Sequence, residues 1–150
     1  MALKILLVST WGAHCGISTY SEQLASALVA VGVRVAVAAP NSPGTARRSI
    51  PGEVPMRMLW ADGGMGLADG VEELLPQVDL VHVQHEHGLF RSADAFLADL
   101  ARIAKKKPVV VTLHTVFDFG IDGCTVFYDC LRCAVNGLIT HTPTAAGVIS

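Results

Sequence analysis

The chain has 150 residues, of which 51% are hydrophobic, 16% charged and 6% aromatic, and its net charge at pH 7 is -2. Its mean hydropathy of +0.47 excludes a disordered chain, and its composition fits neither collagen nor a coiled coil. A chain of this length buries roughly 70% of its unfolded surface, so we predict a single domain over residues 1–150. A pI near 6.3 without a basic stripe argues against nucleic acid as a partner.

The N-terminal segment predicts neither a targeting signal nor a membrane span. It has no charged leader before its apolar run and no small-residue cleavage site, and Trp11 and Gly12 interrupt the run well short of the roughly 20 residues that a span needs. Four cysteines in a chain this rich in core-forming residues do not make a disulfide scaffold. We expect a cytoplasmic protein whose thiols are reduced. The protein itself is either free in the cytoplasm or bound peripherally at the inner membrane face.

Short runs of β-branched residues and leucine predict strands along the whole chain. They are Leu3–Val8, Val33–Ala39, Leu80–Val83, Val109–Leu113 and Gly137–Thr140, with a weaker candidate at Met56–Trp60. Because these runs are apolar on both faces, we expect a parallel sheet that helices cover on both sides.

Helical patterns separate the strands. The first helix has an apolar stripe formed by Tyr20, Leu24, Leu28 and Val31. Residues Thr19–Glu22 predict a capping box that begins this helix, and Gly32 ends it.

Two later helices have clear start signals. Ser92 is the expected N-cap of a helix whose stripe is formed by Phe96, Leu97, Leu100 and Ile103. The positive charges of Lys105–Lys107 interact favourably with the C-terminal end of the helix dipole, and Pro108 is expected to end the helix. Thr142 followed by Pro143 predicts a further helix start. Glycine and proline predict loops at Asn41–Pro55 and Asp62–Gly70.

Alternation of strand and helix predicts an α/β fold with right-handed βαβ units and a doubly wound parallel sheet in three layers. In the commonest strand order, 3-2-1-4-5-6, a crevice opens at the carboxyl ends of strands 1 and 4. The loops there are Thr10–Ser18 and Gln84–Arg91, and the next strand ends at His114. All three carry polar residues that are unusual at the end of an apolar strand.

The turn after the first strand is a candidate phosphate or substrate site, with Gly12, His14, Gly16 and Ser18 as its binding residues. Glycines let the backbone approach a ligand closely, and the positive end of the helix dipole attracts an anion. The lysine of a P-loop is missing, because Ile17 follows Gly16. The turn also lacks the pattern of a dinucleotide fingerprint, and the alternative is a turn that is only tight.

The segment Asp79–Phe90 contains three histidines, a glutamine and a glutamate. His82 and Gln84 share one face of a strand, and Glu86 emerges at the carboxyl end. A zinc site is disfavoured because His82 and His85 point to opposite faces and helical spacing is absent. We expect His82 to be a hydrogen-bonded core residue, Glu86 to be functional and Gln84 to contact the substrate.

His114 and Thr115 end the strand Val109–Leu113. An imidazole at this position donates to a substrate hydroxyl or phosphate, or accepts a proton, near neutral pH. The alternative is a structural histidine whose hydrogen bonds are internal. We predict His114 and Glu86 as catalytic residues and Thr115 as a substrate-binding residue.

The motif Cys130-x2-Cys133 permits half of a zinc site or a redox pair, but a second such motif is missing. We therefore expect Cys15, Cys124, Cys130 and Cys133 to be buried cysteines that pack as small apolar residues.

Taken in order, several segments resemble the N-terminal domain of glycosyltransferases of family 4 with the GT-B fold. The resemblance covers nearly the whole chain and rests on Lys4–Val8, Gly16–Tyr20 with Leu24, Ala27 and Leu28, Gly32–Val35, Asp79–Glu86, Val111–His114 and Gly137–Thr142. In one departure from the family pattern, Cys15 stands where the family has the first of two paired glycines.

The resemblance implies one Rossmann-like half of a GT-B enzyme, which binds the acceptor, facing a C-terminal half that binds a nucleotide-sugar donor. It also implies that Gly12–Gly16 approaches a phosphate or the acceptor, that His114 contacts the transferred sugar and that Glu86 shapes the acceptor side. The reaction moves a sugar to a hydroxyl of a sugar or lipid-linked acceptor, with retention and without a metal or cofactor.

Because the chain stops at Ser150, inside an expected helix, we predict that it is truncated and lacks the donor-binding domain. Without that domain we expect the chain to be inactive alone. We also expect it to self-associate through the cleft face that the missing domain would cover. The main alternative is a non-catalytic Rossmann-like module that binds a phosphate or nucleotide, or a protein that resembles ParA-type ATPases but lacks the P-loop lysine. A zinc or redox protein that uses the cysteines is a third.

Overall fold

The computed structural model describes residues 2–40, 56–60, 66–90, 92–117 and 122–149, with backbone only for 56–60, 122 and 123. Its sheet has six strands, which are β1 (Lys4–Val8), β2 (Arg34–Pro40), β3 (Met56–Trp60), β4 (Leu80–His85), β5 (Val109–Leu113) and β6 (Gly137–Thr140). Every neighbouring pair is parallel and the order is β3-β2-β1-β4-β5-β6. The predicted parallel sheet and its strand order are therefore confirmed.

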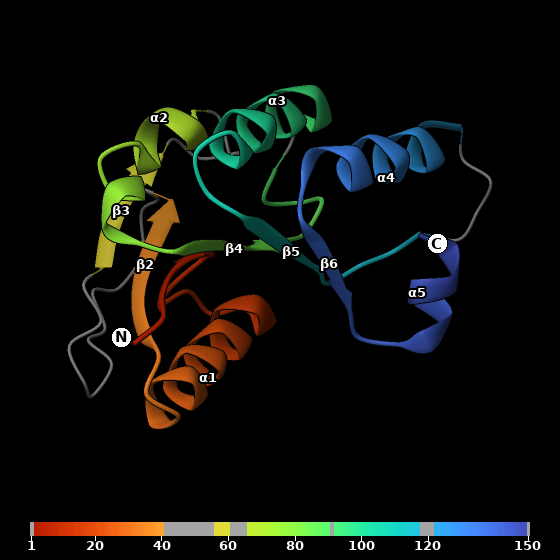
Figure 1. Cartoon of the computed structure of the whole chain (residues 1–150). Helices are drawn as coiled ribbons and strands as arrows, with labels where there is room; N and C mark the ends of the chain where they lie inside the picture. Colours follow the sequence, from red (N-terminus) through yellow and green to blue (C-terminus); the bar gives the residue numbers. More distant parts are fainter. Residues whose placement is uncertain (1, 41–55, 61–65, 91, 118–121, 150) are drawn as a thin grey trace.

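Helices cover both faces of the sheet. They are α1 (Gly16–Ala30), α2 (Leu67–Val71), α3 (Ala93–Ala104), α4 (Asp122–Ala134) and α5 (Pro143–Val148), with a 3-10 turn η1 at Leu75–Gln77. Figure 1 shows α1 on one side of the sheet and α2, α3 and α4 on the other. The three-layer, doubly wound α/β architecture predicted from the strand and helix alternation is confirmed.

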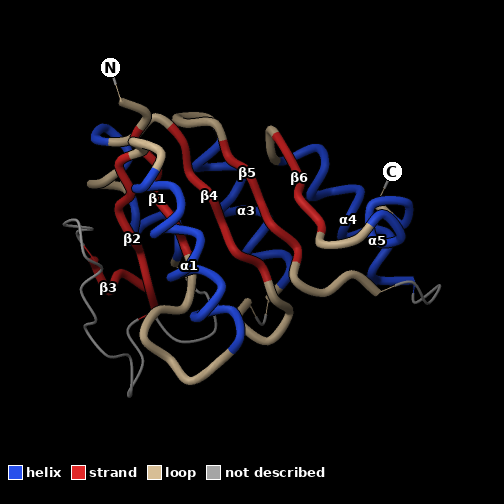
Figure 2. The backbone as a smooth tube through the Cα atoms, turned by 90° about the horizontal axis from the view of Figure 1, so that it is seen from below, coloured by secondary structure: helices blue, strands red, loops and turns tan. Residues whose placement is uncertain are grey.

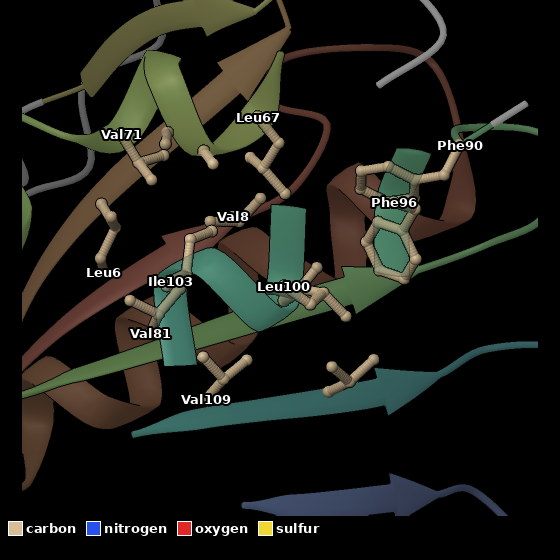
Figure 3. Close-up of a cluster of buried hydrophobic side chains, with 14 of the residues drawn as sticks. Leu6, Val8, Leu67, Val71, Val81, Phe90, Phe96, Leu100, Ile103 and Val109 are labelled. Atoms are coloured by element: carbon tan, nitrogen blue, oxygen red, sulfur yellow. The ribbon is translucent and has the colours of Figure 1, made fainter. Parts of the chain in front are cut away.

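The larger core lies between the sheet and the layer of α2, α3 and α4. Alternate residues of β1, β4 and β5 point into it, as expected for strands whose side chains alternate between faces. Figure 3 shows Val8, Val81 and Val109 facing Leu100 and Ile103 of α3, which lie on its predicted apolar stripe. A smaller core under α1 contains Leu7, Trp11, Ala25, Val35, Val37 and Ala39.

The start of α1 differs from the prediction. The helix begins at Gly16 after Cys15, whose extended backbone occupies the N-cap position without a side-chain cap hydrogen bond. The proposed capping box at Thr19–Glu22 is therefore wrong. These residues lie inside the first two turns, where Thr19 Oγ1 donates to the carbonyl of Cys15 and Glu22 Oε1 accepts from Ser18 Oγ.

The buried face of α1 also differs from the predicted stripe. Ser18, Ser21 and Ala25 are its buried residues, while Val31 is 77% exposed. Small side chains let the helix lie close to the sheet, and the hydroxyls of Ser21 and Ser9 hydrogen-bond at 2.6 Å beneath it. The predicted apolar stripe therefore lies on a partly covered flank of the helix, and smaller residues form its buried centre.

Other helix ends lie where the capping residues in the sequence predict them. Ser92 Oγ accepts from the backbone N–H of Ala95 and Thr142 Oγ1 accepts from that of Ala145, so both predicted N-caps are confirmed. Gly32, which follows the C-cap of α1, has a positive φ of 87° and is confirmed as its end.

Two loop predictions need correction. Within Asp62–Gly70, the helix α2 begins at Leu67, because burial of Leu67, Ala68 and Val71 outweighs the glycine content. Strand β4 runs on to His85, so Gln84 belongs to a strand and not to the predicted loop Gln84–Arg91. The predicted loop Asn41–Pro55 lies outside the described residues.

The prediction of buried cysteines is wrong. Cys15, Cys130 and Cys133 are exposed and Cys124 is partly buried, and all four thiols are free. The buried face of α4 carries Phe127, Tyr128 and Leu131, and Cys130 and Cys133 lie off this face and reach solvent. In the part of the chain that the structure describes, no helix is long and apolar enough to cross a membrane.

Candidate functional site

The carboxyl ends of β4, β5 and β6 meet at one edge of the sheet and bring several polar side chains together. The strands are parallel neighbours, so the residues that end them lie side by side. Gln84 pairs in register with Thr112, and the backbone N–H of His114 donates to the carbonyl of His85 at 3.0 Å. This register places His114 beside the end of β4.

A chain of hydrogen bonds runs through these side chains. His114 Nε2 lies 2.9 Å from Gln84 Oε1, and Gln84 Nε2 lies 3.1 Å from His82 Nε2. His82 Nε2 also lies 2.8 Å from Thr112 Oγ1. Gln84 and Thr112 are fully buried and His82 nearly so, which confirms His82 as a hydrogen-bonded core residue.

Glu86 and Thr115 form a second polar contact next to this chain. Thr115 Oγ1 donates to Glu86 Oε2 at 2.6 Å, and the other carboxylate oxygen accepts from the backbone N–H of His87 at 3.1 Å. These bonds connect the loop after β4 to the segment after β5. They hold the carboxylate at the edge of the sheet, close enough to His114 to influence its charge.

Two aromatic side chains from other elements complete the cluster. The ring of Tyr20 on α1 meets His114 edge-on with centroids 5.0 Å apart, and it meets His141 in the same way at 5.2 Å. His141 follows β6, and its Nε2 lies 3.3 Å from Nδ1 of His114. Tyr20 is half-buried and His141 is exposed, so the cluster opens to solvent on this side.

The environment keeps His82 and His114 neutral near pH 7. Burial lowers the pKa of His114 below its ordinary value of 6.5, His141 lowers it further, and Glu86 partly opposes this. Burial also lowers the pKa of His82, with a smaller contribution from His114. A neutral imidazole offers one N–H donor and one lone pair, so His114 is suited to bind hydroxyl groups and not to provide a fixed positive charge.

The glycine-bearing turn after β1 is held by the start of α1. Gly12 has a positive φ of 66°, which favours glycine, and Ser18 Oγ accepts from the backbone N–H of Ala13 at 3.2 Å. A side chain at Gly16 would meet no atom within 4 Å, so the first residue of α1 faces open space. His14 is exposed in the same turn.

The predicted site residues therefore fall into two groups. Gln84, Glu86, His114 and Thr115 are joined by hydrogen bonds at the carboxyl ends of β4 and β5. Gly12 and His14 lie in the turn after β1, whereas Gly16 and Ser18 lie in the first turn of α1, so the predicted loop Thr10–Ser18 ends at Cys15. Helix α1 carries Tyr20 to the first group. Ser18 is fully buried and braces the turn, and Gln84 is fully buried and supports His114.

His85 lies on the opposite face of β4, away from this cluster. Its ring stacks on Phe90 with centroids 5.6 Å apart and lies 5.0 Å from the ring of His87. Burial lowers its pKa from 6.5 to about 3. The described residues contain no group of histidine, cysteine, aspartate or glutamate side chains that could hold a metal ion.

Sequence reasoning had not assigned Tyr20 and His141 to the site. The contact of His141 with His114 depends on the pairing of β5 with β6, and that of Tyr20 depends on how α1 lies on the sheet. The available signal was positional, because His141 follows β6 as His114 follows β5.

Comparison with known proteins decides the family. Residues 15–133, which include both groups of the candidate site apart from Gly12 and His14, match the family model described as Glycosyltransferase Family 4. The chain belongs to glycosyltransferase family 4. Among curated proteins, none matches the chain significantly.

Solved structures show the fold of this family 4 domain. An α-glucosyltransferase in complex with UDP and a 13-mer DNA containing a HMU base aligns with 14% identity and a TM-score of 0.57, covering 94% of this chain and 38% of that chain. An α-glucosyltransferase in complex with UDP-glucose and DNA containing an abasic site aligns with 13% identity and a TM-score of 0.56, covering 95% and 36%. The family 4 domain thus has the Rossmann-like fold of the N-terminal half of a GT-B glycosyltransferase.

Proposed function

We propose that this domain is the acceptor-side half of a family 4 glycosyltransferase. It acts with a donor-binding half that faces its cleft, and it is inactive alone. The complete enzyme moves a sugar from a nucleotide-sugar donor to a hydroxyl of a sugar or lipid-linked acceptor, with retention of configuration. The chain spans 38% and 36% of the length of the two solved α-glucosyltransferases, which leaves room in such enzymes for a second half.

The observation that carries the proposal is the neutral, half-buried His114 beside Glu86. Glu86 follows β4, which lies beside the point where the strand order reverses, and His114 follows the neighbouring strand β5. In open α/β sheets ligands bind in the crevice at this point. Since Nε2 of His114 contacts Gln84 Oε1, the neutral imidazole binds a hydroxyl of the transferred sugar through Nδ1. Glu86 is an acceptor for hydroxyl groups of the incoming acceptor, and Thr115 holds the carboxylate in place.

The turn after β1 contributes binding and not proton transfer. Open space at Gly16 lets a phosphate or a sugar approach the first backbone N–H groups of α1, where the helix dipole favours negative charge. In the proposed complex, Gly12 and His14 line the approach to this position. The departing diphosphate is stabilised by such fixed dipoles together with cationic groups of the donor-binding half.

The decisive experiment compares His114→Ala with the unchanged enzyme, in a protein that joins this chain to a donor-binding half, with UDP-glucose as the first donor tested. Loss of a group that binds the transferred sugar in the transition state lowers kcat/KM by roughly a hundredfold or more, since one such hydrogen bond contributes about 3 kcal/mol. The control is Lys105→Gln, an exposed change at the end of α3.

Equal rates for His114→Ala and the unchanged enzyme would contradict the proposal. The product's anomeric configuration, read by NMR, tests retention independently. The competing function is a non-catalytic module that binds nucleotide or phosphate. Tight binding of UDP or ATP by this chain alone would favour that function, provided that the chain transfers no sugar when it is joined to a donor-binding half.

A further inference from the structure

Cys130 and Cys133 are two exposed thiols on α4 that the proposed function does not use. Figure 1 shows this helix at the end of the layer formed by α2, α3 and α4. The helix packs on the core through Phe127, Tyr128 and Leu131, and the two cysteines lie off that face. Both thiols are therefore accessible to small molecules in solution.

The spacing of the two cysteines makes them neighbours along one side of the helix. Residues three apart in an α-helix have Cα atoms about 5 Å apart, which is within the range of about 4.4 to 6.8 Å that disulfides span. The pair one position earlier, Asp129 and Arg132, has the same spacing, and its Oδ1 and Nη1 atoms lie 3.9 Å apart. A bond between the two sulfurs thus needs no rearrangement of α4 as a whole.

A disulfide at this spacing is strained. The Cβ atoms of such a pair are about 5 to 6 Å apart in a regular helix, whereas a disulfide needs about 3.5 to 4.5 Å. The backbone must supply the difference, and Cys133 lies in the last turn of α4, where carbonyl groups run out of intrahelical donors and a distortion is least unfavourable. Strained and exposed disulfides are the ones that are easily reduced. The pair is therefore reduced by default and is oxidised only when a disulfide oxidant is present.

The other chemistry that this motif permits, half of a zinc site, lacks further ligands. No group of three or more histidine, cysteine, aspartate or glutamate side chains in the described residues could hold a metal ion. The other two cysteines are not partners at this spacing, because Cys124 lies six residues before Cys130 and Cys15 precedes α1 on the other side of the sheet. Of the four cysteines, Cys130 and Cys133 alone are spaced for a disulfide within one helix turn.

We propose that Cys130 and Cys133 form a redox-sensitive modification site, which a small disulfide such as glutathione disulfide converts reversibly into a disulfide within α4. One thiolate attacks a sulfur of glutathione disulfide, which forms a mixed disulfide and releases one glutathione. The other thiolate attacks the cysteine sulfur of that mixed disulfide, which forms the bond within the helix and releases the second glutathione. Two electrons pass from the protein to glutathione disulfide, and the two thiol protons end on the two released glutathione molecules.

The test uses the folded chain with Cys15→Ser and Cys124→Ser, so that only the pair remains. The reduced protein is incubated with glutathione disulfide at about pH 8, where ordinary thiols are partly ionised, and free thiols are then blocked with N-ethylmaleimide. The intact monomer is expected to lose the mass of two hydrogen atoms and to carry neither glutathione nor maleimide. Trypsin cleaves after Arg132, between the two cysteines, so the fragment that ends at Arg132 should stay joined to the one that begins at Cys133.

Two matched variants in the same background remove one thiol each. Cys130→Ser and Cys133→Ser are both expected to keep a glutathione adduct on the remaining cysteine and to lose the joined fragments, because no second thiol attacks the mixed disulfide. Both positions are exposed, so we expect the variants to fold, and far-UV circular dichroism checks this.

Several outcomes would overturn the proposal. Glutathione that persists on both cysteines without joined fragments would mean that the second attack does not occur in the helix. Fragments joined only in a species of twice the monomer mass would mean that the bond links two copies, and an unmodified chain would mean that the thiols do not react. A bond that survives excess reduced glutathione would contradict its reversibility. None of these measurements depends on sugar transfer, so the result is independent of the proposed function.

Discussion

His85 is surrounded by aromatic rings on the face of β4 that packs against α3 and α4. Phe90, Phe96 and Phe127 lie within 5.6 Å of it between ring centroids, and its side chain is 1% exposed. Its Nδ1 has no hydrogen-bond partner in the part of the chain that the structure describes. A charged ring at this position would lack both water and a counter-charge, so the folded state strongly prefers the neutral form.

This preference predicts a loss of stability in acid. The pKa of His85 falls from 6.5 to about 3 on folding, so between these values the unfolded chain binds a proton that the folded chain excludes. Stability contributed by the neutral ring is present above pH 6.5 and decreases by about 1.4 kcal/mol for each pH unit below it. We expect urea denaturation to show a slope at least this steep, because the lowered pKa values of His82 and His114 add to it, and we expect His85→Phe or His85→Leu to reduce it. An unchanged slope in a folded variant would contradict the assignment to His85.

At the scale of elements, the N-terminus of α1 begins a helix of the fold and is also the proposed binding position for a phosphate or a sugar. Gly16 begins the helix, and an added Cβ there would meet no atom within 4 Å. The fold therefore does not need a glycine at this position. We infer that the open space serves the ligand.

Gly16→Ala separates these two roles. Alanine fits the helix, so we expect the free energy of unfolding to stay the same or to rise by up to about 1 kcal/mol. The new methyl group occupies the space through which the ligand approaches, so KM for transfer is expected to rise roughly tenfold, which corresponds to about 1.4 kcal/mol of binding. Gly147→Ala in α5 is the matched control, because its Cβ would also meet no atom within 4 Å. Unchanged KM in Gly16→Ala would contradict the role of this space.

Elements with strong local signals were predictable from sequence, and those set by packing were not. The buried strands β1 and β5 and the caps Ser92 and Thr142 were placed correctly, since apolar runs and capping hydroxyls act within a few residues. The start of α1 was missed because Cys15 caps it through backbone conformation alone. Helix α2 was missed because burial against the core, which lies far away in sequence, stabilises its short turn.

The same division holds within the candidate site. His114 and Glu86 end or follow strands, so the strand order alone brought them to one edge of the sheet. The contact of His114 with Gln84 followed from the parallel register of β4 and β5. The meeting of Tyr20 with both imidazoles depends on the angle and depth at which α1 packs, which no local pattern in the sequence specifies.

At the scale of the whole molecule, the face of the sheet that carries the candidate site is unevenly covered. In Figure 2, α1 lies in front of β1, whereas the described part of the chain places no helix in front of β5. Ile139 on β6 is 43% exposed and pairs in register with Thr112, so it lies on the site's face. In the described residues, β6 pairs only with β5 and its outer edge is open. An exposed apolar side chain on an open edge strand favours association.

We therefore predict that the chain self-associates through this face. Gel filtration with light scattering is expected to give a mass that rises above 15.8 kDa as concentration increases. Ile139→Lys places a charge on the face and is expected to shift the chain toward the monomer. Val31→Lys, at the C-terminal end of α1 where the side chain is 77% exposed, is the control for a general gain in solubility. A monomer at every concentration would contradict the prediction, and an equal effect of the two lysines would place the contact elsewhere. If a donor-binding half covers this face in the complete enzyme, adding that half should abolish self-association, because both partners would compete for Ile139.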